Sequence, residues 1–240
     1  MIFGLDTSTN WLSLALRQDG RSLAHSHEQL ERRHNEAILP ALERLLAGVG
    51  RPPKALQGIV VGMGPGSFTG VRVGIATALG LAQALDIPAV GISSFLAVAA
   101  GTSADRVLVL ADALQEAVYA AAFQHGPQGW ETLLPEQLCY LPDLPGLLPA
   151  GPWAVAGPGA RQFFAFLSVQ RPGLTLLPED HATPSAEVLT RLADGTLSSP
   201  HAGQLTRGGM PLGDIKPIYL RKTQAEELRD QRQRATDPKR

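Results

Sequence analysis

The fold of this chain is decided by one glycine-punctuated run: Gly62-Met63-Gly64-Pro65-Gly66-Ser67-Phe68-Thr69-Gly70-Val71-Arg72-Val73-Gly74. The apolar stretch Gly58–Gly62 before it predicts a buried strand, and Ser67–Leu85 behind the Gly-Pro-Gly turn predicts a long helix. The run lacks the Gly-Lys-Ser/Thr ending of a phosphate loop. It is also an incomplete dinucleotide fingerprint, because Thr69 stands where the third glycine belongs. The free N–H groups at the start of the helix could still face an anion.

One stripe of this predicted helix carries almost no side chain. Its members recur at every fourth residue: Gly70, Gly74, Ala78 and Ala82. Another helix can approach such a stripe closely. Other faces carry apolar bulk, so the helix must be largely covered; these residues are Val71, Ile75, Leu79 and Leu81. Two interpretations stay open: the helix packs inside its own domain, or a partner chain covers one side of it.

The turn Asp6-Thr7-Ser8-Thr9 lies between two predicted strands, Ile2–Leu5 and Leu12–Leu16. A carboxylate beside hydroxyl groups and turn amides can hold a magnesium–phosphate group. Asp6, Thr7 and Ser8 are therefore candidate nucleotide or phosphate residues. The same residue types are ordinary in turns, where they bond to their own backbone. The turn alone does not decide between the two interpretations.

The elements around these motifs follow a regular order. Asp19-Gly20 is a hairpin signal before a third strand, Ser22–His27. Apolar residues at helical spacing then predict a helix over His34–Ala47; they include Ile38, Leu39, Leu42, Leu45 and Leu46. Ala89–Ile92 predicts a strand, and Ser93 or Ser94 caps a helix that ends at Ala100. The predicted order is three strands, helix, strand, helix, strand, helix.

The pattern then restarts less regularly. Val107–Leu110 predicts a strand that ends at Asp112, as the first strand ends at Asp6. We expect further strands at Val118–Phe123, Trp130–Leu134, Trp153–Ala156 and Leu174–Leu177, a loop at Leu141–Pro152, and helices at Arg161–Leu167 and Ser185–Leu192. This predicts an α/β protein with two related lobes, residues 1–102 and 103–223. Residues 224–240 form a charged tail, expected to be a solvated helix end or disordered, and RNA contact through its arginines stays open.

Composition excludes several classes of protein. The 240 residues are 44% hydrophobic and 18% charged, which is typical of a globular chain. The net charge of -1 gives no general attraction to nucleic acid. The single cysteine, Cys139, cannot form an internal disulfide and suits a reducing compartment. We expect no signal peptide and no membrane span, because the apolar stretches are short or interrupted.

Metal and nucleophile motifs are not recognisable in the sequence. A metal pair on a helix needs histidines three or four residues apart, but Ile38 stands four residues after His34. His25 and His27 share one strand face without an evident additional ligand nearby. Ser67 lacks the glycine spacing of a nucleophile elbow. We therefore expect no metal site and no catalytic residue.

Four segments together resemble the TsaB (YeaZ) family. They are Leu5-Asp6-Thr7-Ser8, Arg33-His34-Asn35-Glu36 with Leu39-Pro40, the run from Gly64 to Gly74, and Pro217-Ile218-Tyr219-Leu220-Arg221. The resemblance implies a two-lobed ASKHA fold (actin-like ATPase, ribonuclease H-like) with a shortened second lobe. It further implies a cytoplasmic, non-catalytic subunit for threonylcarbamoyladenosine modification of tRNA, at the adenosine beside the anticodon.

The resemblance also implies the partners. This chain would bind and stabilise a catalytic TsaD paralogue, work with the ATPase TsaE, contact tRNA through the complex, and self-pair when alone. It would bind no cofactor tightly, with ATP or ADP and metal held in the complex by its partners. The expected partner interface consists of His34, Glu36, Ile38, Leu39, Leu42, Gly66, Phe68, Gly70, Val71, Arg72, Gly74, Ile75 and Ala78.

Two departures from related patterns bear on function. Gly157-Pro158-Gly159-Ala160 is the nearest match to the adenosine loop of actin-like chains, but it lacks the final Asn. After Asp112-Ala113, Leu114 and Ala117 stand where the family usually has Arg and Glu. The competing hypotheses are an autonomous ASKHA ATPase or kinase with Asp6 and Asp112 flanking a nucleotide cleft, a protease, and a plain structural homodimer. The missing adenosine loop speaks against the ATPase.

Overall fold

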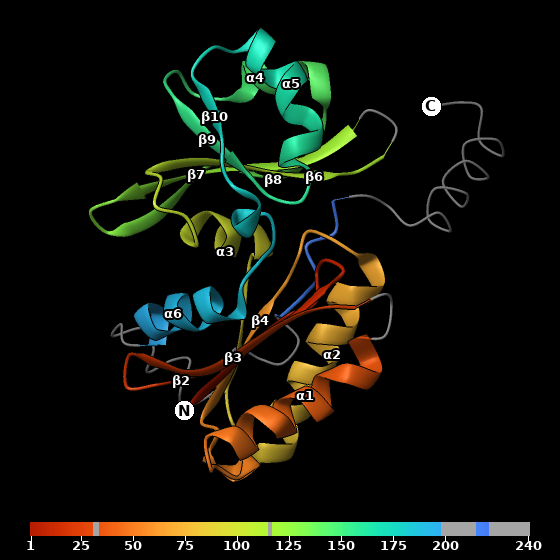
Figure 1. Cartoon of the computed structure of the whole chain (residues 1–240), viewed down its shortest axis with the longest axis vertical. Coiled ribbons are helices and arrows are strands. Elements are labelled where there is room, and N and C mark those ends of the chain that lie inside the picture. The colour runs from red at the N-terminus through yellow and green to blue at the C-terminus, as the bar shows by residue number, and fades with distance from the viewer. Residues whose placement is uncertain (31–33, 115–116, 198–214, 221–240) are drawn as a thin grey trace, which may run out of the picture.

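The computed structural model describes residues 1–30, 34–114, 117–197 and 215–220, and Figure 1 shows them as two stacked lobes. Each lobe is built on a five-stranded mixed sheet. Helices cover the outer face of each sheet, and two further helices lie between the sheets. The two-lobed α/β fold predicted from the sequence is confirmed.

The first sheet has the strand order β3-β2-β1-β4-β5. Its strands are β1 (Ile2–Asp6), β2 (Trp11–Gln18), β3 (Arg21–Gln29), β4 (Gly58–Gly62) and β5 (Ala89–Ile92). The central strand β1 pairs antiparallel with β2 and parallel with β4. The hairpin between β2 and β3 turns through Asp19 and Gly20, which have φ angles of 51° and 74°. A two-residue turn with both φ angles positive matches the twist of paired strands.

The second sheet repeats this order. Its strands are β6 (Arg106–Asp112), β7 (Ala117–Gly126), β8 (Gly129–Tyr140), β9 (Trp153–Ala156) and β10 (Leu174–Leu176). Starting from the hairpin side, the sheet reads β8-β7-β6-β9-β10, which corresponds strand for strand to the first sheet. The strand predicted at 130–134 is longer than expected, because pairing with β7 continues to Tyr140. The predicted structural repeat is confirmed at the level of strand order.

Helices cover the outer face of each sheet. On the first lobe these are α1 (His34–Gly48) and α2 (Phe68–Leu85), and on the second lobe α4 (Leu144–Leu147) and α5 (Ala160–Gln170). Three short 3-10 turns, Pro53–Ala55, Leu141–Asp143 and Glu179–His181, complete the connections. The loop prediction for 141–152 was wrong in part: Leu144 is fully buried under the second sheet, and its burial holds α4 in place.

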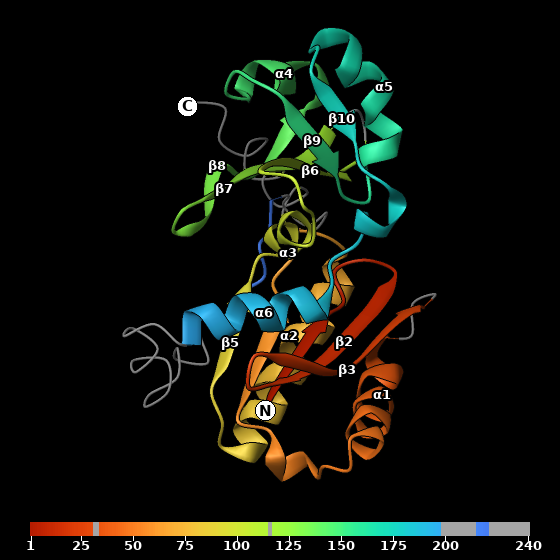
Figure 2. The same ribbon diagram turned by 60° about the vertical axis from the view of Figure 1, so that its left-hand side comes forward.

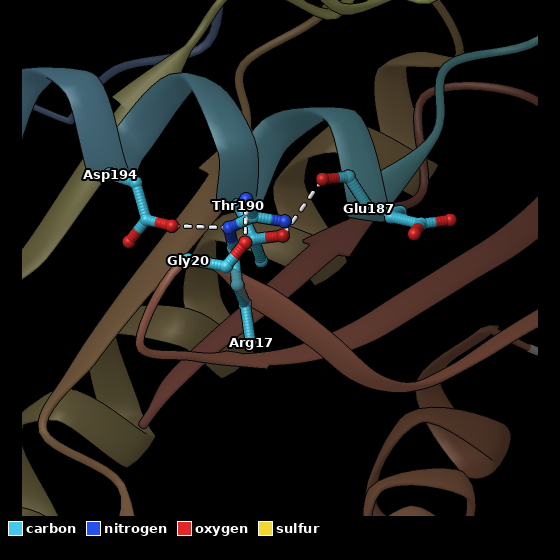
Figure 3. Close-up of polar contacts among 5 residues, drawn as sticks. All are labelled: Arg17, Gly20, Glu187, Thr190 and Asp194. Carbon is cyan, nitrogen blue, oxygen red and sulfur yellow. Dashed lines mark hydrogen bonds and ion pairs between the residues drawn. The ribbon is translucent and has the colours of Figure 1, made fainter.

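Helix α6 (Ala186–Leu197) covers the inner face of the first sheet, opposite α1 and α2. Val188 and Leu189 of α6 pack with Val60 of β4. The residues on either side of Val60, Ile59 and Val61, face the opposite way, toward α2. Polar contacts add to this packing (Figure 3). Arg17 of β2 forms an ion pair with Asp194 and donates to the Gly20 carbonyl at 2.6 Å.

The short segment Ile215–Leu220 also lies on the first lobe. Ile215 is 4% exposed within the core of that lobe, and the Ile218 N–H donates to the Met63 carbonyl at 2.9 Å. The prediction that 103–223 forms the second lobe therefore differs from the packing, because the chain returns to the first lobe after Thr183. The amphipathic pattern of α6 shows that one face is buried, without showing which sheet buries it. Residues 224–240 lie outside the described residues.

Helix α3 (Ser94–Ala100) joins the two lobes (Figure 2). Phe95 and Val98 pack into the second lobe with Val107 and Phe123. Ala97 and Ala100 face the other way and pack against α6 and β4. Because one helix contributes to both cores, apolar burial fixes the two sheets relative to each other.

Candidate functional site

The exposed outer surface of α1 and α2 is the first candidate functional surface. Of the predicted interface residues, five are exposed: Glu36, Leu39, Gly66, Phe68 and Arg72. The other eight are buried in this chain: His34, Ile38, Leu42, Gly70, Val71, Gly74, Ile75 and Ala78. Buried residues can shape such a surface but cannot touch a partner directly. The interface assignment itself stays a prediction.

The small-residue stripe of α2 packs inside its own lobe, against the turn after β1. A Cβ atom on Gly70 would lie 2.1 Å from the Thr7 carbonyl oxygen, and one on Gly74 would lie 2.3 Å from Thr7 Oγ1. The Thr7 hydroxyl also donates to the Gly70 carbonyl at 2.7 Å. Of the two interpretations left open by the sequence, this stripe follows the first, because it packs inside its own lobe. Gly70 and Gly74 meet a turn of that lobe, and only glycine lets the two segments come this close.

A second stripe on α2 points away from the sheet. Arg72, Ala76 and Gly80 are exposed at four-residue spacing, and a Cβ atom on Gly80 would meet nothing within 4 Å. On the neighbouring helix α1, Leu39 is 47% exposed. Ala76 and Gly80 are absent from the interface predicted from the sequence. Their four-residue spacing could have indicated them, but the prediction followed the stripe that contains more glycine. Together these residues form a low, partly apolar face that a helix from another chain can approach closely.

The carboxylate of Asp6 is buried behind the turn. It accepts hydrogen bonds from the Ser8 N–H at 2.8 Å, the Ser8 hydroxyl at 2.7 Å and the Ser94 hydroxyl at 2.6 Å. Burial raises the pKa of Asp6 above its usual value, and the hydrogen bonds from Ser94 and Ser8 oppose that shift. Asp6 is 1% exposed, so in this conformation its carboxylate organises the turn and faces no open cleft.

An open cleft of about 1290 Å³ lies between the lobes. Its first-lobe wall includes Ser8 and the start of α2, and its second-lobe wall includes Asp112, Leu114 and Tyr119. Of the three predicted phosphate residues, only Ser8 lines the cleft, because Asp6 and Thr7 are turned inward. Asp112 is exposed and accepts a hydrogen bond from the Leu114 N–H at 2.8 Å. Among the residues that the structure describes, the cleft wall therefore has one exposed carboxylate, Asp112, whereas the ATPase hypothesis expected two, Asp6 and Asp112.

The second-lobe loop that was compared with an adenosine loop packs tightly on β6. The Gly159 N–H donates to the Leu110 carbonyl at 2.9 Å, and Gly157 has a φ of 100°. A Cβ atom on Gly157 would lie 2.5 Å from the same carbonyl oxygen. Close backbone packing thus accounts for the glycines in this loop. Pro158 alone of the loop lines the interlobe cleft.

Neither a metal cluster nor a clear membrane helix is present in the described part of the chain. No group of three His, Cys, Asp or Glu side chains there is arranged to hold a metal ion. Helix α2 has the length and apolar composition of a membrane span, with a mean hydropathy of 1.3. Its buried stripe and apolar flank serve the core of the first lobe, which explains the composition without a bilayer.

The sequence comparisons point to one group of proteins. The family model described as TsaD, tRNA N6-adenosine threonylcarbamoyltransferase, matches residues 26–167. The chain is 32% identical to the tRNA threonylcarbamoyladenosine biosynthesis protein TsaB of Escherichia coli (strain K12), over 92% of this chain and 94% of that protein. A tRNA N6-adenosine threonylcarbamoyltransferase of Nitratidesulfovibrio vulgaris (strain DP4) is 34% identical, but the match covers only 45% of this chain and 34% of that enzyme.

The structural comparison agrees with the sequence. YeaZ from Pseudomonas aeruginosa superposes with a TM-score of 0.75 at 29% identity, covering 91% of this chain and 99% of that one. The lobes, the two sheets and their helices are therefore shared along nearly the whole length. The match to the transferase is partial, whereas the match to E. coli TsaB covers more than nine-tenths of both chains. The chain belongs to the TsaB (YeaZ) family.

Proposed function

We propose that this chain is a non-catalytic, cytoplasmic subunit that binds a TsaD paralogue and supports threonylcarbamoyl modification of a tRNA adenosine. The observation that carries the proposal is the similarity to E. coli TsaB over 92% of this chain, because the name of that protein places it in threonylcarbamoyladenosine biosynthesis. The partial match to a transferase fits a paralogue that shares the fold with the catalytic chain. On this view two related chains pair, and one of them does the chemistry.

The outer face of α1 and α2 supplies the pairing surface in this proposal. Leu39 and Phe68 are large apolar side chains at 47% and 40% exposure on adjacent helices. Further along α2, the small exposed residues Ala76 and Gly80 leave room for a helix of the partner. Two such helices from each chain would make a four-helix interface with closely spaced axes. The same face would allow this chain to self-pair when the partner is absent.

The interior of the chain supports the non-catalytic role. Asp6, the residue expected to face a magnesium ion, spends both carboxylate oxygens on Ser8 and Ser94. A reaction at the interlobe cleft would have to proceed with Asp112 as its only exposed wall carboxylate in the described residues. We therefore assign ATP or ADP and metal to the partners, including TsaE, and tRNA contact to the assembled complex.

The test is reconstitution. Purified chain, its TsaD paralogue and TsaE are mixed, the mass is measured by light scattering, and tRNA modification is assayed with each component omitted in turn. We expect a stable heteromeric complex that modifies tRNA only when this chain is present. A chain that stays unpaired and hydrolyses ATP alone would overturn the proposal in favour of an autonomous ATPase. Modification at full rate without this chain would overturn it as well.

A further inference from the structure

Three residues form a cation–aromatic cluster at the first turns of α2. The guanidinium carbon of Arg72 lies 3.9 Å from the ring centroid of Phe68 and 5.4 Å from that of Tyr219. The two rings are themselves in contact, with centroids 5.2 Å apart. Arg72 Nε also donates a hydrogen bond to the Tyr219 hydroxyl. Phe68 and Arg72 come from one helix, whereas Tyr219 comes from a segment almost 150 residues later.

The late segment is anchored independently of the cluster. Ile215 is buried in the first-lobe core, and the Ile218 N–H donates to the Met63 carbonyl just after β4. Tyr219 therefore reaches α2 from a position set by the sheet. This gives a role to the Pro217-Ile218-Tyr219-Leu220 motif, which the proposed pairing of α1 and α2 alone leaves unexplained.

The three side chains of the cluster contact one another, but they leave surface open to a further partner. Phe68 and Tyr219 remain 40% and 46% exposed, and Arg72 is exposed as well. Arg72 makes no ion pair with any carboxylate of the described residues, although Arg17, Arg44 and Arg161 each have one. With Nε bound to Tyr219, the two terminal nitrogens of the guanidinium are left as a fork of donors. Such a fork matches the geometry of a carboxylate.

We propose that Tyr219 positions Arg72 to bind a carboxylate side chain of the partner subunit, with Phe68 as the apolar anchor beside it. This inference rests on the proposed function and deepens it. The cluster is continuous with the proposed pairing face, because Arg72 begins the exposed stripe that continues through Ala76 and Gly80. Interfaces concentrate their binding energy in such Arg and aromatic residues, packed and surrounded by neutral contacts.

Charge favours a protein carboxylate over an RNA phosphate. The exposed positions of α1 and α2 carry Glu36 and Glu43 as well as Arg44 and Arg72, and Arg44 is paired with Glu28 at 3.4 Å. Binding of an RNA backbone requires several uncompensated cations along a track. Within the described part of α1, α2 and residues 215–220, Arg72 is an arginine without a carboxylate partner and lies against two aromatic rings, which suits a single carboxylate in a largely neutral interface.

The experiment measures the affinity of the full chain for its TsaD paralogue at low and high ionic strength. We expect Arg72→Gln to weaken binding about tenfold or more and to remove most of the salt dependence. Tyr219→Phe keeps the ring but loses the hydroxyl, and should weaken binding about three- to tenfold. The variant that combines Arg72→Gln with Tyr219→Phe should bind no worse than Arg72→Gln alone, because the tyrosine acts through the arginine. If the tyrosine had only a structural role, the two losses of affinity would add. Arg161→Gln, whose arginine pairs with Glu179 on the second lobe, is the matched control.

Several outcomes would overturn the inference. Wild-type affinity in Arg72→Gln would exclude a carboxylate contact, and a loss with unchanged salt dependence would reduce the cluster to packing. A defect confined to tRNA binding, with normal subunit affinity, would assign the cluster to RNA. Wild-type chain that forms no complex would overturn the proposed function itself, so the two failures are distinguishable. Thermal unfolding of each variant verifies that all of them fold.

Discussion

The two small-residue stripes of α2 differ in what they meet. The stripe that begins at Gly70 and Gly74 lies against the Thr7 turn, where added Cβ atoms would fall 2.1 Å and 2.3 Å from Thr7 oxygens. The stripe with Ala76 and Gly80 faces outward, and a Cβ atom on Gly80 meets nothing within 4 Å. Identical spacing therefore supports two different functions: one stripe closes the lobe, and the other is free to meet another chain.

The largest expected effect is on the inner stripe. Gly74→Leu places a branched side chain where Thr7 Oγ1 already lies, so the turn and α2 must separate. We expect a loss of about 3 kcal/mol in the free energy of unfolding, measured by chemical denaturation. Failure to pair would follow from this instability. A Gly74→Leu chain with wild-type stability would show that the inner stripe is not closed by Thr7.

The outer stripe should respond in the opposite way. Gly80→Leu adds bulk to open space and removes a glycine from a helix, so the chain should become more stable by about 0.5–1 kcal/mol. Affinity for the TsaD paralogue should fall at least about tenfold, because the added side chain keeps the partner helix away. Calorimetry measures both quantities. Gly146→Leu, an exposed glycine of α4 with equally open surroundings, should leave affinity unchanged.

Two ion pairs allow a similar comparison, because one is partly buried on the inner face of the first sheet and the other is exposed on the second lobe. Arg17 and Asp194 are 13% and 30% exposed where α6 crosses the sheet, whereas Arg161 and Glu179 are 75% and 72% exposed. We expect Arg17→Met to cost about 1–2 kcal/mol of unfolding free energy, since it leaves Asp194 half-buried and unpaired. Arg161→Met should change stability by less than about 0.5 kcal/mol. Equal costs would mean that α6 is held by its apolar face alone.

The smallest expected effect is a pH dependence of the stability of the chain, caused by the buried carboxyl group of Asp6. Burial raises the pKa of Asp6 above 3.8, so the folded state favours the protonated carboxyl. The resulting stabilisation is complete below the unfolded-state pKa and is lost as pH rises through the folded-state pKa. Asp6→Asn cannot ionise. The stability of wild type relative to Asp6→Asn should therefore fall with rising pH in this range, and a relative stability that rises would contradict the burial of Asp6.

The comparison also separates what could be predicted from what could not. The succession of strands and helices along the chain was readable in both lobes, because alternation, apolar runs and turn residues such as Asp19-Gly20 are local signals. The placement of α6 was not, since an amphipathic helix reveals a buried face without naming the sheet that buries it. Asp6 shows the same limit at the candidate site: its position at the end of β1 suggested a cation ligand, and only the packing of Ser94 against it showed an internal role.

The sequence by itself determined the repeated succession of strands and helices, the helix after the Gly-Pro-Gly turn and the resemblance to the TsaB family, because these depend on local pattern and on motifs. Only the tertiary structure decided which stripe of α2 is free, where α6 lies, and that Tyr219 reaches Arg72. Those features arise from contacts between segments far apart in the chain. Periodicity specifies that a face must be covered, but its partner is selected by the packing of the whole molecule.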